Sequence, residues 1–436
     1  MLEEQVAAEQ DLVTPTPGVR QLSRLLAPFA VPAYRRMAVA LVCGAFAYGV
    51  WTVALVWEVI RLGGGPAQLS LVSTAGAVGV VIPALLAGVV ADRVPQKLIV
   101  MSVATFECVC YAVITVLSLT EVTRLWHLAV AALFLGMGLA FYYAAYSAWL
   151  PALVPSSTLQ AVNGFEGMVR PLVAEAIGPG VAGVVVGLAS PGVAVLIAAV
   201  VAAAGVLVQT GLPRTPVRRD LTDVDRHPVR GALADMREGV GYMVHTPWLL
   251  STLLFASLMV LLTMGPFEVL IPFVIKDRLG GGATDHALVL GSFGVGGAVG
   301  SLAMASVRMP RRYLTLMNLC WGVACLPMVV MGVASAIWVL VVAAFLLGVL
   351  FSAPMVIWGT LLQRRVPAHL LGRIASLDFF VSICLMPVSM ALAGPVSDLI
   401  GVGTTFLVAG VTPIFFAVIA IVWARLPADE IANPME

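Results

Sequence analysis

The chain has 436 residues, of which 61% are hydrophobic and only 11% are charged, and its formal net charge is +1. A soluble globular domain carries about 25% charged residues because its surface faces water, so this composition excludes a water-soluble protein and indicates one embedded in lipid. The lipid bilayer is therefore the expected partner of most of its surface.

Apolar runs of about 20 residues or more recur along the chain, and each is long enough to cross roughly 30 Å of hydrocarbon as a helix. Twelve such runs cover residues 37–60, 68–91, 98–118, 126–150, 158–188, 191–212, 247–275, 287–306, 313–333, 336–362, 371–400 and 403–425. Stretches such as 196–208 are apolar on every face, which does not fit the alternating pattern of a β-barrel strand. The sequence predicts an all-α membrane protein with twelve transmembrane helices.

The positive charges predict the orientation of these spans. With the N-terminus in the cytoplasm, 19 of the 24 Lys and Arg residues fall in cytoplasmic segments, 4 fall outside and Arg170 lies within a span. Because cytoplasmic loops retain positive charge, we expect a multi-pass protein of a bacterial-type plasma (inner) membrane with both termini in the cytoplasm. The first 36 residues have no isolated apolar core, so no cleavable signal peptide is expected.

Two similar halves are predicted on either side of a hydrophilic segment. Residues 155–159 before the fifth span resemble 367–371 before the eleventh, which indicates an internal repeat of six spans. Duplicated halves are a common architecture of secondary transporters, in which one half rocks against the other. The predicted organisation is a cytoplasmic N-terminal segment 1–36, a six-helix bundle 37–212, a cytoplasmic linker 213–246, a pseudo-symmetric six-helix bundle 247–425 and a cytoplasmic tail 426–436.

The loop after the second span carries a recognisable motif. Residues 88–97 read Gly-Val-Val-Ala-Asp-Arg-Val-Pro-Gln-Lys, with Gly88, Asp92, Arg93 and Lys97 at the key positions. This segment resembles the loop between spans two and three of the major facilitator superfamily, although Pro-Gln stands where that family usually has Gly-Arg. The resemblance implies a gating loop in which Asp92 faces the eleventh span and Gly88 permits a close approach of the helices.

Two further segments resemble drug exporters of that superfamily. Gly178, Pro179 and Gly183 in the fifth span resemble the Gly-Pro antiporter motif. Residues 367–378, at the opening of the eleventh span, resemble the branch that holds macrolide-type efflux pumps and the enterobactin exporter. The resemblance covers about residues 37–425 and implies the major facilitator fold and proton antiport. One departure is Ala132, which stands where many proton antiporters carry an Arg in the fourth span.

Ionisable residues within spans are rare and costly, so each is a functional candidate. Glu166 and Arg170 lie four residues apart, which predicts an intrahelical ion pair with a structural or gating role. Glu175 lies nine residues beyond Glu166, about 180° around a regular helix, and has no local cation. It is the first candidate for proton coupling, and the alternative is a protonated carboxyl bonded to a backbone carbonyl. Asp378 and Glu107 are further coupling candidates.

Three other acidic residues lie toward the outer ends of their spans. Glu58, Glu268 and Asp398 are expected to be headgroup-level or gate residues rather than coupling residues. Outside the spans, no nucleotide-binding loop is present, since no glycine run is followed by Lys-Ser or Lys-Thr. All six cysteines lie in spans and are expected to be apolar fillers rather than metal ligands. We expect no cofactor and no metal.

The superfamily lines its central cavity with spans one, four, seven and ten. Among the aromatic and methionine residues of these spans, the predicted cavity residues are Tyr48, Trp51, Tyr142, Tyr146, Phe255, Met259, Phe351, Met355 and Trp358. Such side chains bind bulky apolar or cationic molecules through stacking, cation-π contact and flexible packing. The alternative is an interfacial aromatic belt. This composition favours an amphipathic substrate over a strongly polar one.

The sequence therefore predicts a secondary active exporter of amphipathic, drug-like molecules that exchanges them for protons by alternating access. A dedicated exporter of one metabolite, such as a siderophore, and a non-transporting membrane receptor on the same fold stay open as alternatives. No enzymatic activity is expected, because no cluster of His, Asp and Glu lies at a membrane face. No nucleic-acid partner is expected, and the family default is a monomer.

Overall fold

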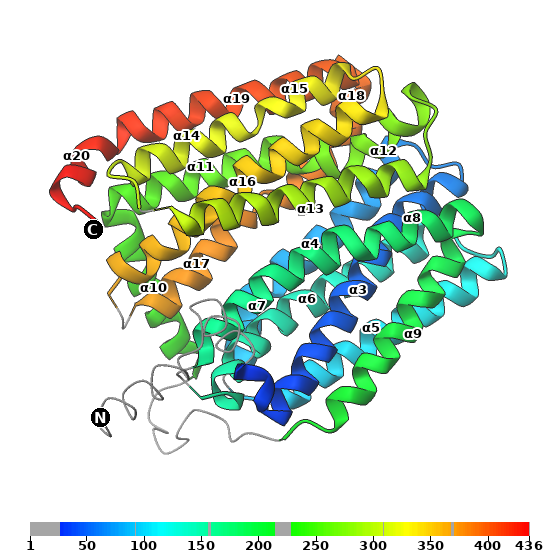
Figure 1. Cartoon of the computed structure of the whole chain (residues 1–436), viewed down its shortest axis with the longest axis horizontal. Helices are drawn as coiled ribbons and strands as arrows, with labels where there is room; N and C mark the ends of the chain where they lie inside the picture. Colours follow the sequence, from blue (N-terminus) through cyan, green and yellow to red (C-terminus); the bar gives the residue numbers. More distant parts are fainter. Residues whose placement is uncertain are drawn as a thin grey trace, which may run out of the picture.

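The computed structural model describes residues 27–91, 93–155, 158–213, 228–307, 309–367 and 370–435. All regular elements of these residues are helical, and twelve spans within them are long and apolar enough to cross a membrane (Figure 1). The predicted all-α fold with twelve transmembrane helices is confirmed. Each of these spans begins and ends within five residues of its predicted boundary, because a switch from apolar to polar residues marks both ends of a membrane helix.

The first six spans form one bundle, here called the N-half. Its elements are α3 (Pro32–Arg61), preceded by the short η1 (Ala27–Ala30), then α4 (Pro66–Ala91), α5 (Gln96–Leu119), α6 (Leu125–Leu153), the fifth span α7 (Leu159–Pro171), η3 (Leu172–Ile177) and α8 (Gly178–Leu188), and α9 (Pro191–Thr210). The fifth span changes to wider π-helical winding at η3, directly after Pro171, whose ring prevents the regular hydrogen bond of an α-helix.

The last six spans form the C-half. Its elements are α11 (Pro247–Gly265), η4 (Pro266–Leu270), α12 (Ile271–Phe273) and η5 (Val274–Arg278) in the seventh span, then α13 (Ala283–Ser306), α14 (Tyr313–Ala324) with α15 (Leu326–Val333), α16 (Ile337–Arg365), α17 (Leu371–Ile383) with α18 (Met386–Ile400), and α19 (Val402–Trp423). The amphipathic α10 (Pro228–His245) precedes this half and packs on α17, and α20 (Leu426–Ala432) follows it.

Glycines let helices pack closely at matching places in the two halves. In the N-half, a side chain at Gly136 of α6 would clash with the backbone of α4 at Gly76. In the C-half, side chains at Gly296 and Gly300 of α13 would clash with the backbone of α16. The pairing of the second span with the fourth thus recurs as the pairing of the eighth with the tenth, as expected for a duplicated six-helix unit.

The two halves meet at one end of the molecule and diverge toward the other (Figure 1). At the meeting end, the backbone N–H of Gly394 in α18 donates to Ser70 Oγ of α4 at 2.8 Å, and Thr284 Oγ1 of α13 donates to the carbonyl oxygen of Gly183 in α8 at 3.1 Å. We call this the outer end. The opposite end, where α3 begins and α10 and α20 lie, is called the inner end and is the cytoplasmic side in the predicted orientation.

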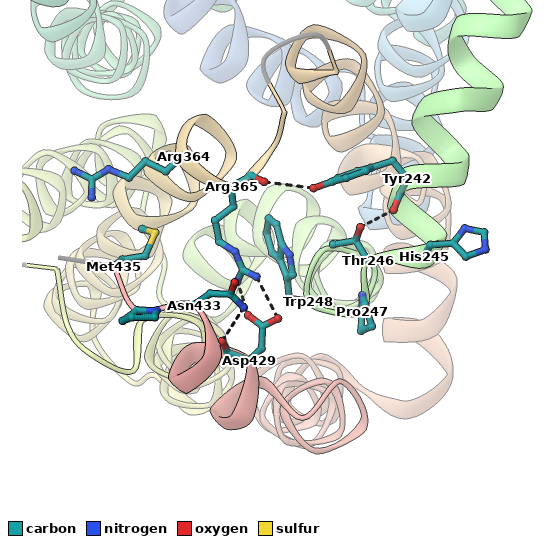
Figure 2. Close-up of a pocket in the computed structure, with 11 residues that line it drawn as sticks. Tyr242, His245, Thr246, Pro247, Trp248, Arg364, Arg365, Asp429, Asn433 and Met435 are labelled. Atoms are coloured by element: carbon teal, nitrogen blue, oxygen red, sulfur yellow. Dashed lines mark hydrogen bonds and ion pairs between the residues drawn. The ribbon is translucent and has the colours of Figure 1, made fainter.

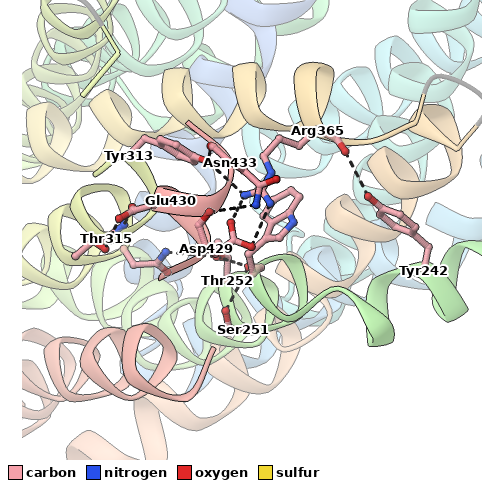
Figure 3. A network of polar contacts seen from close by, with 11 residues as sticks. Tyr242, Ser251, Thr252, Tyr313, Thr315, Arg365, Asp429, Glu430 and Asn433 are labelled. Carbon is pink, nitrogen blue, oxygen red and sulfur yellow. Dashed lines mark hydrogen bonds and ion pairs between the residues drawn. The ribbon is translucent and has the colours of Figure 1, made fainter. Parts of the chain in front are cut away.

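The segment after the last span is docked on the inner end of the C-half (Figure 3). Asp429 of α20 receives two hydrogen bonds from Arg365 of α16, at 2.5 and 3.2 Å. Glu430 accepts from the backbone N–H of Thr315 at 2.6 Å and from its hydroxyl at 3.0 Å, so it caps the first turn of α14. The predicted tail 426–436 thus contains a helix that fastens α14 and α16 together.

Candidate functional site

The gating-loop motif lies at the inner end of the N-half, and Asp92 lies outside the described residues. Lys97 donates to the carbonyl oxygens of Thr210 at 2.9 Å and Leu212 at 2.5 Å, so it caps the last turn of α9. Arg93 is exposed. The described part of the motif therefore fastens the start of α5 to the end of α9 within one half.

The close helix approach expected at Gly88 is absent from this conformation. A side chain built at Gly88 would meet no atom within 4 Å. The physical reason is that the halves are in contact at the outer end, while Gly88 lies near the inner end of α4, where they diverge.

The glycines of the antiporter motif have two different partners. A side chain at Gly178 would lie 2.9 Å from the Cα of Gly49 in α3, so this glycine permits close packing within the N-half. A side chain at Gly183 would lie 2.5 Å from the Cβ of Ala287 in α13, so this glycine permits contact between the halves. Pro179 is buried beside Gly49. The motif therefore joins α8 to its own half and to the opposite one.

Three polar side chains from both halves come together in the middle of the molecule. Tyr48 of α3 is 44% exposed and interacts electrostatically with Glu175 of η3 and Glu268 of η4. The two carboxyl groups also interact with each other, although one belongs to the N-half and the other to the C-half. We call Tyr48, Glu175 and Glu268 the central cluster.

Glu268, which the sequence predicts to be a headgroup-level or gate residue, lies deeper in its span than the headgroup level. The seventh span continues to Arg278, beyond the predicted end, so Glu268 lies ten residues inside it. Its side chain is exposed and lies within electrostatic range of Glu175 and Tyr48. The sequence signal for Glu268 is that it is a lone acidic residue within an apolar span. Because the helix ends later than predicted, this residue lies closer to the centre of the span than the sequence indicates.

Glu175 packs against α13 of the opposite half. A side chain at Gly294 would lie 2.9 Å from the Cβ of Glu175, so only glycine fits there. The 180° separation from Glu166 that regular helical spacing predicts does not apply, because π-helical winding changes the angle per residue within η3. Glu175 is thus at the boundary between the halves, where the packing changes when they move.

The predicted Glu166–Arg170 pair is present, and an aromatic cluster surrounds it. Arg170 Nη2 lies 3.5 Å from Glu166 Oε2, and the hydroxyl of Tyr146 donates to Glu166 Oε1. The Arg170 guanidinium lies 4.8 Å from the ring centroid of Tyr146 and 5.2 Å from that of Tyr143. Tyr142 stacks on Tyr146 with centroids 5.4 Å apart. These contacts fix the cation between aromatic rings of α6.

The other two coupling candidates lie apart from the central cluster. Asp378 Oδ2 accepts from Trp358 Nε1 at 3.0 Å, which ties α17 to α16. Glu107 of α5 faces α6, because a side chain at Gly138 would lie 3.1 Å from Glu107 Oε1. Both carboxyl groups are therefore held inside a single half.

Of the predicted cavity residues, four have side chains that are exposed or half-buried, and these are Tyr48, Tyr142, Phe351 and Met355. The remaining five are buried within the bundles, with exposed fractions between 2% and 7%, and these are Trp51, Tyr146, Phe255, Met259 and Trp358. Trp51 packs on Tyr111, and Trp358 packs on Trp248 and Trp321. In this conformation the buried five stabilise each half rather than face the space between the halves.

A polar cavity of about 680 Å³ lies at the inner end of the C-half, beside α20 (Figure 2). Arg365 forms its centre: the guanidinium lies over the ring of Trp248 at 4.6 Å and is bonded to Asp429. None of the intramembrane candidates lines this cavity. Because its cation is already paired within the protein, it is a structural junction distinct from the central cluster.

Comparisons with known proteins agree with the geometry. A family model described as "Transmembrane secretion effector" matches residues 23–435. The multidrug efflux pump Tap of Mycolicibacterium fortuitum is 26% identical over 399 residues, which cover 88% of this chain and 94% of that protein. Tap of Mycobacterium tuberculosis H37Rv is 24% identical over 393 residues, covering 87% and 90%.

A solved structure shares the fold. The crystal structure of the nucleoside transporter NupG superposes with a TM-score of 0.64 and 13% sequence identity, covering 92% of this chain and 99% of that one. At this identity the likeness concerns architecture alone. Together with the family match, it confirms the predicted major facilitator fold, and the protein is a multi-pass membrane transporter.

Proposed function

Because the chain belongs to the transmembrane secretion effector family of the major facilitator superfamily, we propose that it exports amphipathic small molecules in exchange for protons. The relatives named multidrug efflux pumps support outward transport and a broad range of substrates. Both termini are in the cytoplasm, so the conformation described above, with its outer end closed, faces inward.

The central cluster is the observation that carries this proposal. Glu175 and Glu268 are acidic side chains of opposite halves that lie within electrostatic range of each other. Carboxyl groups within a membrane protein that face its interior form proton relays in pumps and transporters. A proton bound there changes the interaction between the halves, and this links proton binding to their rocking motion.

The exposed part of the predicted lining supports an amphipathic substrate. Tyr48 and Met355 have exposed fractions of 44% and 51%, and they belong to opposite halves. An aromatic ring and a thioether offer stacking and adaptable apolar packing, and the two carboxyl groups attract a positive charge. A molecule with apolar rings and a cationic amine fits this chemistry.

The test uses the purified full chain in proteoliposomes with an imposed pH gradient and a fluorescent amphipathic cation. We expect Glu175→Gln and Glu268→Gln each to lower gradient-driven accumulation by about tenfold or more, because an amide cannot carry the proton. Asp398→Asn is the matched control: its carboxyl is exposed near the outer end of α18, and we expect unchanged transport. Full gradient-driven accumulation in both glutamine variants would overturn the proton-coupling role of the cluster.

A further inference from the structure

One aromatic contact joins the halves on the diverging side of the central cluster. Tyr143 of α6 stacks on Phe379 of α17, with ring centroids 6.1 Å apart and planes 19° apart. The first ring belongs to the N-half and the second to the C-half. Neither residue was among the cavity residues predicted from the sequence.

The depth of this ring pair places it between the central cluster and the inner end. At 1.5 Å per residue, Tyr143 lies about 15 Å from the inner end of α6, and Phe379 lies about 12 Å from that of α17. Tyr48 and Glu175 each lie about 24 Å from the inner ends of their spans. A molecule moving from the inner side to the central cluster therefore passes the ring pair.

The two rings are not part of a packed core. Tyr143 is 48% exposed and Phe379 is 39% exposed, although the rings are in contact. By contrast, the neighbouring Tyr146 on α6 is 3% exposed. Separating the pair thus uncovers little additional apolar surface, which suits a contact that forms and breaks during transport.

Each ring is held by polar contacts within its own half. Arg170, fixed by Glu166, lies over the ring of Tyr143 at 5.2 Å. Phe379 directly follows Asp378, which accepts hydrogen bonds from Trp358 Nε1 at 3.0 Å and from Ser382 Oγ at 3.3 Å. The Glu166–Arg170 pair thus contacts the ring of Tyr143 directly, whereas the hydrogen bonds of Asp378 hold the stretch of α17 that carries Phe379 against α16.

We propose that Tyr143 and Phe379 form an aromatic constriction that controls access from the inner side to the central cluster, and that Arg170 is a positioning residue for Tyr143. The proposal deepens the proposed function and rests on it for the identity of what passes. The constriction itself is a geometric property, so it is tested without transport.

The test measures thiol accessibility in inside-out membrane vesicles. The full chain carries Tyr48→Cys as the reporter in a background in which the six native cysteines are replaced by serine. A bulky, membrane-impermeant maleimide then reaches the reporter only by way of the inner side. With Tyr143→Leu and Phe379→Leu combined, we expect labelling to accelerate about fivefold, because leucine keeps apolar bulk but cannot stack.

Two matched controls distinguish the loss of the constriction from a general loosening of the helix packing. Tyr143→Phe keeps the ring, and Phe134→Leu removes a similarly exposed aromatic of α6 that pairs with Phe106 inside the N-half. Both should label at the parent rate. Equal labelling in the parent, the controls and the double-leucine variant would overturn the proposal. Monodisperse elution of each variant in detergent shows that it is folded. If the double-leucine variant is not folded, Tyr143→Leu alone replaces it in the labelling experiment.

Arg170→Lys tests the positioning role. Lysine keeps the charge opposite Glu166 but lacks the planar guanidinium that stacks on an aromatic face. We expect labelling about twofold faster with an unchanged melting temperature, a combination that a purely structural role does not produce. Unchanged labelling would show that Arg170 does not position the ring. No proton gradient is used, so a failure of proton coupling in the glutamine variants leaves these results interpretable.

Discussion

Glu166 and Arg170 form a charged pair within a membrane-spanning helix, and its partners explain how it is tolerated. The side chains are 9% and 26% exposed, and the carboxyl group also accepts a hydrogen bond from Tyr146. The cation lies against two tyrosine rings. Removing one charge leaves the other buried without compensation, whereas removing both leaves no uncompensated charge.

This difference makes a prediction about stability. Glu166→Gln alone and Arg170→Gln alone should each destabilise the protein by about 2 kcal/mol, and the variant with both changes should lose only about half as much. The midpoint of thermal unfolding in detergent measures the three variants against the parent. A double variant less stable than either single one would show that the pair contributes net stability through its attraction.

The residues that could be predicted from the sequence are those whose partners are local. The spacing of Glu166 and Arg170 is one helical turn, so their pairing follows from the sequence alone. Glu175 and Glu268 are far apart in the chain, and their proximity depends on how the two halves pack. Tyr143 was missed because it lies one residue off the face shared by Tyr142 and Tyr146, and no local signal singles out Phe379.

At the scale of the helices, apolar length determines the spans, while proline and glycine determine their shape. Composition predicts where each span begins and ends but not the π-helical turn of η3, because that turn depends on how the groups freed by Pro171 are bonded in the folded helix. Composition also does not predict which glycines permit close packing. Gly180 and Gly183 belong to the same helix, but of these two only Gly183 lies against α13.

Gly183→Val should therefore impair transport through sterics alone. Even the first carbon of a side chain would lie 2.5 Å from Ala287 Cβ, so α8 and α13 can no longer close at the outer end. Gly180→Val is the matched control, since a Cβ there meets nothing within 4 Å. We expect about a tenfold lower transport rate for Gly183→Val and nearly parental transport for Gly180→Val. Similar rates in proteoliposomes for the two variants would contradict the proposed contact.

At the scale of the whole molecule, the halves touch at one end and diverge at the other. At the outer end, the backbone N–H of Gly394 in α18 donates to Ser70 Oγ of α4 at 2.8 Å. Transport by alternating access requires this contact to open in every cycle. The contact combines this hydrogen bond with close packing of Gly394 on Ala67 of α4, so its opening and closing can be tested by a cross-link.

A disulfide between Ser70→Cys and Gly394→Cys should hold the outer end closed. A Cβ at Gly394 would lie 2.8 Å from Ser70 Oγ, which is close enough for a bridge, but also 2.7 Å from the Cα of Ala67, so the backbones of α4 and α18 must move slightly apart to accommodate the cysteine. In a background without the native cysteines, oxidation should stop transport almost completely, and a reductant should restore it. Each single cysteine variant should be insensitive to oxidant. Undiminished transport by the fully cross-linked protein would rule out opening at this end.

The docked C-terminal segment has a consequence for how the protein is made. Asp429 and Glu430 supply the partners for Arg365 and Thr315, which are synthesised more than sixty residues earlier. Until α20 has been synthesised, the arginine beside Trp248 and the first turn of α14 are without these partners at the membrane surface. The C-half is therefore completed only after α20 is made. A chain that stops short of α20 leaves Arg365 without its carboxylate partner and α14 without its cap, features by which a membrane protease can distinguish it from a chain that contains α20.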